Sequence, residues 1–235
     1  MKVAIHQPQF LPWLGYLDKI DQADLFIVLA TVQFKKNEWQ NRNRIRTATG
    51  WQWVTVPVLQ HFGQRIDEVR INSTAAWRAQ HLRALDMHYA RAPYRDRYLP
   101  ELRDLYERSW GKLFDLNLAV ILWLLNAYGI TTPVRCASEW TVREEPTDRL
   151  VDLCRAVGAT QYLTGPGAEG YMDTPRLEAS GVRLEMQAFQ HPTYRQTYEP
   201  FEPNLSAIDL LLMQGPEALA TLRQARPAQK TMTAA

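Results

Sequence analysis

Residues 3–20 read V-A-I-H-Q-P-Q-F-L-P-W-L-G-Y-L-D-K-I, and residues 23–46 read A-D-L-F-I-V-L-A-T-V-Q-F-K-K-N-E-W-Q-N-R-N-R-I-R. The first apolar run predicts a strand that ends at His6, and the prolines at 8 and 12 fix the backbone of the turn that follows. Apolar residues then recur at helical spacing, and the run at 25–34 predicts a second strand. A strand, polar turn, helix and strand in this order predict an α/β protein with its ligand site at the strand ends.

The rest of the chain continues the alternation of strands and helices. A hairpin that turns at 48–50 is expected first, followed by strands at 66–71, 134–140, 160–164 and 183–189. Helices are expected from the capping residues 72–74 onward, with Pro100 in the first turn of the next helix and Gly129 closing a third. We therefore predict a Rossmann-like three-layer α/β fold with a mainly parallel or mixed sheet and a helical insert at about 75–129. Residues 1–226 are expected to form one domain and residues 227–235 a frayed tail.

The composition is that of an ordinary globular protein. The chain has 235 residues, of which 46% are hydrophobic and 22% charged, and its net charge of +2 gives no reason to expect a nucleic-acid or membrane partner. The two cysteines, Cys136 and Cys154, have no metal-ligand spacing and cannot form a disulfide framework. The first residues predict no signal peptide, and the apolar stretch at 116–125 is too short to span a bilayer. The expected protein is soluble and cytoplasmic.

Candidate site residues gather where the first two predicted strands end. A neutral imidazole at His6 suits proton transfer, or anion binding once it is protonated, although a hydrogen-bonded turn histidine has the same pattern. Cations cluster downstream at Lys35, Lys36, Arg42, Arg44 and Arg46. Guanidinium groups bind phosphate or carboxylate at two points, but a solvated basic loop is the alternative interpretation.

Two later features complete the list from residue chemistry. The turn Gly165-Pro166-Gly167 follows a strand, where backbone N–H groups can bind an anion, and a tight turn without ligand is equally compatible. Asp209 is a carboxylate within an apolar helix, and because a buried carboxylate needs a partner, we expect it to pair with an N-terminal arginine, in a contact that is either structural or part of the site. His81 is expected to be a half-buried polar residue. No spacing in the sequence predicts a metal site, and no cofactor is identified.

Several separated motifs resemble the WbqC-like family over residues 2 to 220. They are A-I-H-Q-P-Q-F-L-P-W-L-G-Y at 4–16, V-Q-F with W-Q-N-R-N-R-I within 32–45, W-V-T-V-P-V at 53–58, W-R-A-Q-H-L at 77–82, Y-L-T-G-P-G-A-E-G-Y-M at 162–172, H-P-T-Y-R-Q at 191–196 and L-S-A-I-D-L-L at 205–211. The resemblance implies a presumed transferase of bacterial O-antigen, other polysaccharide or natural-product biosynthesis. In that family, acidic residues commonly precede V-Q-F, whereas this chain has Ala30 and Thr31.

The motifs and the residue chemistry together define the expected site. His6, Gln7 and Asp209 are expected to take part in the reaction. The expected substrate-binding residues are Gln33, Lys35, Asn41, Arg42, Asn43, Arg44, Gly165, Gly167, Tyr171, Tyr194, Gln196 and Ser206. Their partner would be a small or carrier-linked substrate that bears a phosphate or carboxylate.

Three functions are compatible with this pattern. The leading hypothesis is a transferase that moves an acyl or aminoacyl group from an activated donor to a sugar or small metabolite. A fainter likeness to pantothenate synthetases and other adenylyl-transferring enzymes suggests ATP-dependent activation, although those enzymes carry two histidines near the first helix and this chain has only His6 there. The third hypothesis, a non-catalytic anion- or carrier-binding protein, is favoured by Ala30 and Thr31.

Overall fold

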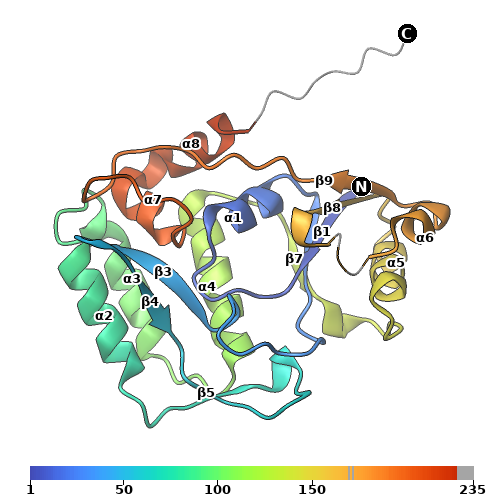
Figure 1. The fold of residues 1–235 in the computed structure, drawn as a ribbon, viewed down its shortest axis with the longest axis horizontal. Coiled ribbons are helices and arrows are strands. Elements are labelled where there is room, and N and C mark those ends of the chain that lie inside the picture. Colours follow the sequence, from blue (N-terminus) through green and yellow to red (C-terminus); the bar gives the residue numbers. More distant parts are fainter. Residues whose placement is uncertain (169, 171, 227–235) are drawn as a thin grey trace.

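A five-stranded parallel sheet forms the centre of the molecule (Figure 1). The computed structural model describes residues 1–168, 170 and 172–226. In spatial order the strands are β7 (Val134–Cys136), β2 (Leu25–Val28), β1 (Lys2–His6), β8 (Gln161–Thr164) and β9 (Arg183–Met186). This confirms the predicted Rossmann-like α/β fold and makes its sheet wholly parallel.

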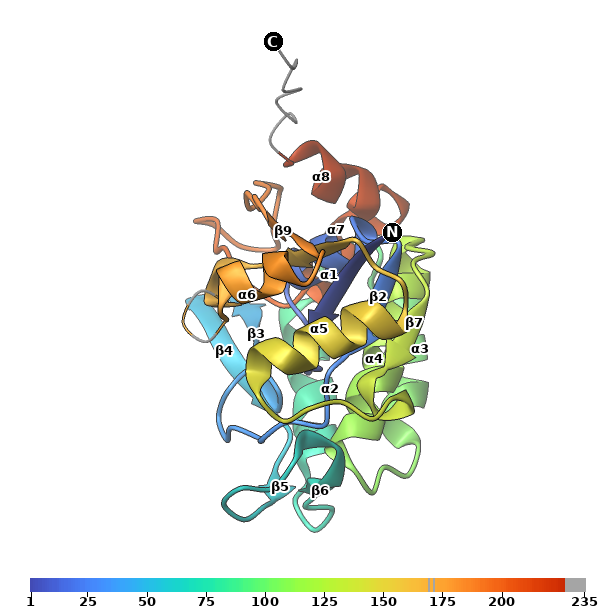
Figure 2. The ribbon, with the colours of Figure 1, turned by 90° about the vertical axis from the view of Figure 1, so that its right-hand side faces the viewer.

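The two faces of the sheet pack against different helices, because successive side chains of a strand point to opposite faces. Val3 and Ile5 of β1 belong to a small core with α5 (Pro146–Ala156) and α6 (Thr174–Ala179). Ala4 belongs to the larger core on the other face, which includes α1 (Leu14–Asp21). Figure 2 shows α5 and α6 in front of the sheet and the remaining helices behind it.

The larger core is completed by helices from two parts of the chain. They are α2 (Trp77–His88), α3 (Arg95–Glu107), α4 (Leu113–Tyr128), α7 (Ile208–Gln214) and α8 (Ala218–Gln224). The first three occupy the predicted helical insert, and their buried side chains pack into the same core as one face of the sheet. Gly129 ends α4 in the left-handed conformation, φ 76°, that favours glycine.

Two predicted helix starts were wrong. The helix expected from residues 72–74 begins only at Trp77, because the Asn72 side chain accepts hydrogen bonds from the backbone and hydroxyl of Thr74 and holds a turn there. Pro100 lies within α3 rather than in its first turn. Because proline has no N–H, α3 lacks one intrahelical hydrogen bond. The burial of the apolar face of α3 offsets this loss in stability.

Antiparallel ribbons flank the main sheet. β3 (Arg42–Thr47) pairs with β4 (Gly50–Thr55), as the predicted hairpin requires, and β5 (Val58–Leu59) pairs with β6 (Arg70–Ile71). The expected strand at 66–71 was mostly wrong, since a 3₁₀ turn occupies Ile66–Glu68. The expected strand at 25–34 stops at Val28, because the chain then leaves the sheet and Phe34 N–H donates to the Gln64 carbonyl.

The strand order places a topological switch point between β1 and β8. From β1 the chain moves to β2 and later β7 on one side, and it returns through β8 and β9 on the other. Ligands of open parallel sheets bind beyond the carboxyl ends of the strands at such a point. Here those ends are His6 and Thr164.

Two further observations concern the cysteines and the length of the helices. Cys136 and Cys154 form no disulfide. Over the described ranges, none of the helices has the length and apolar character needed to cross a membrane.

Candidate functional site

A cavity of about 510 Å³ opens at the switch point, beyond the ends of β1, β2 and β8. We call it the cation-lined cavity, because Lys19, Lys35 and Arg149 contribute to its wall. Its other lining residues are Ile5, His6, Gln7, Leu29, Val32, Gln33, Pro146, Leu150, Tyr162, Thr164, Gly165 and Gly167. The described lining contains no carboxylate, so the cavity favours an anionic ligand.

His6, the last residue of β1, is held as a neutral imidazole. Its Nδ1 lies 2.9 Å from the Gln7 carbonyl, which assigns the ring proton to Nδ1 and leaves Nε2 as an acceptor. The ring also packs edge-on against Tyr16, with 5.1 Å between centroids. Burial, followed by the charge of Lys19, lowers the pKa of His6 to about 3. His6 is therefore a hydrogen-bond acceptor at Nε2 rather than a cation.

Lys19 is the site residue that the sequence interpretation missed. It projects from α1, is only 5% exposed, and its ammonium makes no hydrogen bond or ion pair within the described residues. Burial lowers the pKa of Lys19 to about 8, against the opposing effect of Asp18. A sequence signal existed, because Lys19 lies between Leu17 and Ile20 in the first predicted helix, where apolar residues recur at helical spacing.

Gly165 gives a ligand access to Lys19. A Cβ atom at position 165 would stand 3.3 Å from Lys19 Nζ, closer than most contacts of this kind. The absence of a side chain therefore keeps the space beside the ammonium open. Gly165 and Gly167 were predicted as substrate-binding residues, and both line the cation-lined cavity.

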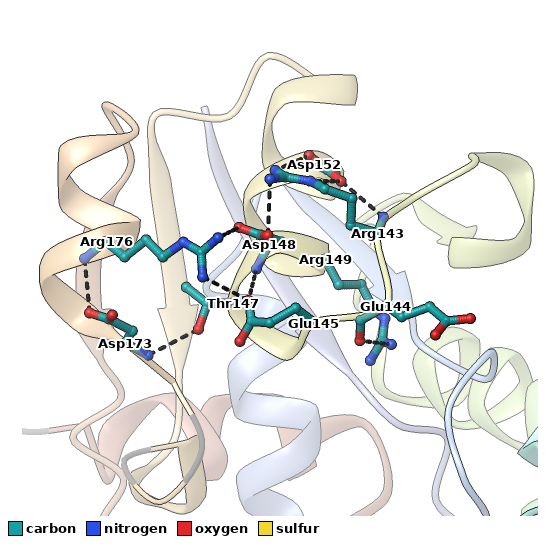
Figure 3. Close-up of polar contacts among 9 residues, drawn as sticks. All are labelled: Arg143, Glu144, Glu145, Thr147, Asp148, Arg149, Asp152, Asp173 and Arg176. Atoms are coloured by element: carbon teal, nitrogen blue, oxygen red, sulfur yellow. Dashed lines mark hydrogen bonds and ion pairs between the residues drawn. The ribbon is translucent and has the colours of Figure 1, made fainter.

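Arg149 enters the cavity from the first turns of α5, whose start is fixed by a network of charges (Figure 3). Asp148 pairs with Arg143 at 3.0 Å and with Arg176 at 2.6 Å. Arg149 itself donates to the Glu144 carbonyl. These contacts keep the Arg149 guanidinium near the cavity with donors left over for a ligand.

The predicted residues Gln7, Gln33 and Lys35 also line the cation-lined cavity. Gln7 is held in place by a 2.6 Å hydrogen bond from Gln40 Nε2 to its Oε1. Gln40 in turn accepts from the Lys35 backbone N–H at 2.9 Å. The chain after β2 is thus tied to the turn after β1, so that both contribute to one wall.

A second cavity, of about 540 Å³, lies beside the first. We call it the aromatic cavity, because Trp13, Trp39 and Phe189 line it, together with Arg44 and other residues. Trp13 and Phe189 meet edge to face at 5.2 Å, and a Cβ at position 15 would stand 2.4 Å from the Trp13 ring. Gly15 is therefore required for the position of that wall. The two cavities share His6, Lys19, Gly165 and Gly167.

Polar groups on the aromatic cavity remain available to a ligand. Gln9 is buried, and its Oε1 has no hydrogen-bond partner in the described part of the chain. Arg44 donates to the Asn204 carbonyl at 3.0 Å and stacks over Trp51 at 5.0 Å. The cavity thus combines flat apolar walls with amide and guanidinium groups.

Three of the predicted binding residues instead support the backbone around the site. Asn41 donates to the Val56 carbonyl, and Asn43 donates to the carbonyls of Phe10 and Leu11. The Arg42 guanidinium stacks on Trp53 at 4.1 Å. None of them lines a cavity described here.

The predicted C-terminal residues form a separate buried cluster. Asp209 accepts hydrogen bonds from the hydroxyls of Tyr89 and Tyr194 and from Gln196, at 2.8–2.9 Å. The expected ion pair with an N-terminal arginine is absent within the described residues, and Arg46 instead contacts the Tyr89 hydroxyl through its backbone N–H. Burial raises the pKa of Asp209, although these hydrogen bonds oppose it. None of the cluster lines the two cavities.

The remaining predicted residues have different positions. Ser206 accepts from the Ile208 N–H at the start of α7, and its own N–H donates to the Arg44 carbonyl. Tyr171 lies outside the described residues. His81, expected to be half-buried, is buried; its Nε2 lies 3.1 Å from the Thr55 carbonyl, whereas its Nδ1 has no hydrogen-bond partner among the described residues.

The described residues contain no group of three His, Cys, Asp or Glu side chains that could hold a metal ion. At the positions where the family commonly has acids, Ala30 is buried and Thr31 lines a neighbouring cavity. Neither residue offers a carboxylate, so these two positions supply no acidic ligand or base.

Fold and geometry together define an α/β protein with two adjoining cavities at the switch point of a parallel sheet. A family model described as the WbqC-like protein family matches residues 7–221, and the chain belongs to that family. It is 35% identical over 229 residues to "Uncharacterized protein Rv1507c" of Mycobacterium tuberculosis (strain ATCC 25618 / H37Rv), covering 96% of this chain and 99% of that protein. No solved structure matches the chain.

Proposed function

We propose that this protein is a transferase that moves an acyl or aminoacyl group from an activated donor to a sugar or small metabolite. The observation that supports this most directly is the pair of cavities that meet at His6 and Lys19. A transfer reaction needs two substrates whose reacting atoms approach one another at one point. The cation-lined cavity suits the donor's phosphate or carboxylate, and the aromatic cavity suits the acceptor.

The reaction requires one proton transfer. A hydroxyl or amine of the acceptor attacks the acyl carbon, and the bond between that carbon and the leaving group breaks. His6 Nε2 takes the acceptor's proton and passes it to the leaving group, while Gln7 orients polar groups. An anion bound beside Lys19 removes part of the effect that lowers the pKa of His6, so the imidazole becomes a better base once the donor is bound.

The proposal assigns the donor's anion to other cations than the sequence interpretation did. Arg42 is stacked on Trp53, and Arg44 lines the aromatic cavity. Lys19, Lys35 and Arg149 are the cations of the donor side. A role in bacterial polysaccharide, O-antigen or natural-product biosynthesis remains what family membership suggests.

The test is a product search by mass spectrometry, with coenzyme A thioesters as donors and amino sugars as acceptors. We expect a product heavier than the acceptor by the acyl group, and a loss of about 100-fold or more in turnover for His6→Gln. His61→Gln is the matched control, because His61 is exposed and lines neither cavity. Equal turnover in His6→Gln would remove His6 from the mechanism.

A non-catalytic anion- or carrier-binding protein is the second candidate. It is favoured by the pKa of about 3 for His6, which makes the imidazole a weak base, and by the absence of acids at Ala30 and Thr31. For such a protein, ligand affinity survives His6→Gln and falls in Arg149→Met. ATP belongs in the same binding experiment, since a rise in melting temperature with ATP would instead favour nucleotide-dependent activation.

A further inference from the structure

The positive charge of Lys19 is only partly offset by the charge of Asp18, which raises the pKa of Lys19 less than burial lowers it. The residue is 5% exposed, and within residues 1–168, 170 and 172–226 its ammonium has neither a hydrogen bond nor an ion pair. Buried ammonium groups are costly unless a charge or hydrogen-bond acceptor compensates them. Such a group in a cavity is therefore an indication of a ligand.

The adjacent carboxylate is held by other partners. Asp18 is fully buried and accepts hydrogen bonds at 2.6 Å from Gln22, Gln187 and Arg226. Arg226 reaches Asp18 from the end of α8 and forms an ion pair with it. The negative charge nearest to Lys19 in the sequence is thus neutralised by an arginine from the far end of the chain.

The surroundings of Lys19 favour an anion. Gly165 leaves the space beside Nζ open, and His6 is close enough for the lysine charge to affect its protonation. Lys35 and Arg149 add positive charge to the same wall. The described linings of both cavities contain no Asp or Glu to compete with a ligand.

We propose that Lys19 binds an anionic oxygen of the ligand, a phosphate or a carboxylate, at the point where the two cavities meet. The anion completes the counter-charge that Asp18 supplies only in part. This inference rests on the proposed function in one respect, since the anion is taken to belong to the activated donor. The chemistry of the anion is the same for a phosphate and for a carboxylate, and the experiment separates them.

The experiment measures the binding of pyrophosphate and of malonate to the purified protein by calorimetry at constant ionic strength. Lys19→Met removes the charge and keeps the length of the side chain. Lys36→Met is the matched control, because Lys36 is exposed and lines neither cavity. We expect at least one of the two anions to bind, with affinity at least 10-fold weaker in Lys19→Met and unchanged in Lys36→Met. Pyrophosphate alone would identify a phosphate site, and malonate alone a carboxylate site.

A second measurement tests whether the anion binds beside His6. The ring-proton NMR signals of His6, assigned by their absence in His6→Gln, are expected to shift when the anion is added to the wild type and to stay unchanged in Lys19→Met. Equal affinity in Lys19→Met, or no binding of either anion, would overturn the inference. These measurements do not involve turnover, so anion binding at Lys19 without product formation would reject the transferase and leave the anion site intact.

Discussion

The two central residues of the site, His6 and Lys19, owe their properties to burial. An exposed histidine and an exposed lysine would both titrate near their ordinary values, whereas here the pKa of each is lowered. The same burial that disfavours the lysine charge makes it receptive to an anion. At the residue scale, the burial of these two groups thus lowers the stability of the folded protein.

That cost predicts a pH dependence. Between the folded pKa of Lys19, about 8, and its unfolded value of 10.5, the unfolded chain binds more protons than the native one. The stability of the wild type relative to Lys19→Met is therefore expected to rise by about 2 kcal/mol from pH 7 to pH 9.5. Urea unfolding at each pH measures this difference, and Lys19→Met is expected to be the more stable protein at pH 7.

Lys36→Met provides the comparison for this pH series. Lys36 is exposed, so its substitution should change stability by less than about 0.5 kcal/mol. Parallel pH profiles for the wild type and Lys19→Met would mean that Lys19 is compensated in the folded protein, and that no free cation awaits a ligand.

At the scale of elements, side chains of the β3–β4 hairpin contact tryptophan rings and backbone carbonyls, and none of them lines the cation-lined cavity. The alternation along β3 separates Arg42 and Arg44, which are half-buried and stack on tryptophans, from Asn43, which is buried and binds backbone carbonyls. The arginines and Asn43 therefore lie on opposite faces of the strand. The two arginines stack on aromatic rings because Trp39, Trp51 and Trp53 contact one another on the same face.

Arg46 connects the hairpin to residues 198–200 near the C-terminal helices. It is almost fully buried, and its guanidinium donates to the carbonyls of Thr47, Gly50, Tyr198 and Pro200. Arg46→Met leaves these acceptors unpaired, and we expect a loss of roughly 3 kcal/mol or more in the free energy of unfolding. Chemical denaturation measures it.

Arg42, in the same hairpin, provides the control for Arg46→Met. In Arg42→Met only a stacking contact on Trp53 is lost, so the expected cost is about 1 kcal/mol or less. Similar losses for the two variants would show that the four carbonyl contacts of Arg46 contribute little.

At the scale of the whole molecule, segments that lie far apart in the sequence meet at α1. Arg226 follows α8 and pairs with Asp18 and Asp21 of α1, across 208 positions of sequence. This ion pair joins the segment after α8 to α1 and engages one oxygen of Asp18. We therefore expect this segment to influence, through Asp18, a cavity whose wall it does not line.

Arg226→Ala is expected to have two effects. It leaves the buried Asp18 without its ion pair, so unfolding stability should fall by roughly 2 kcal/mol. The freed carboxylate can then compensate Lys19, so pyrophosphate affinity should also fall. Calorimetry and chemical denaturation measure the two changes, with the exposed Arg108→Ala as control. Unaltered anion affinity would indicate that Asp18 does not reach Lys19.

The sequence was most informative about local properties. The strand ending at His6, the helix after it, the hairpin and the glycine end of α4 all follow from periodicity and turn chemistry within a few residues. Boundaries failed where distant contacts intervened, as at Phe34, which pairs with Gln64 instead of extending β2. The residues at strand ends, Gln7, Gln33 and Lys35, were found because parallel strands bring their carboxyl ends to one edge.

What the sequence by itself determined is therefore the α/β class, the WbqC-like family and the edge of the sheet where the cavities lie. The tertiary structure alone decided which polar groups are satisfied. Asp209 meets two tyrosines and a glutamine, and Asp18 meets Arg226, so each carboxylate has its partners. Lys19 is left without one in the described structure. The physical reason is that periodicity is set by near neighbours, whereas the partner of a buried charge depends on which remote segments meet around it.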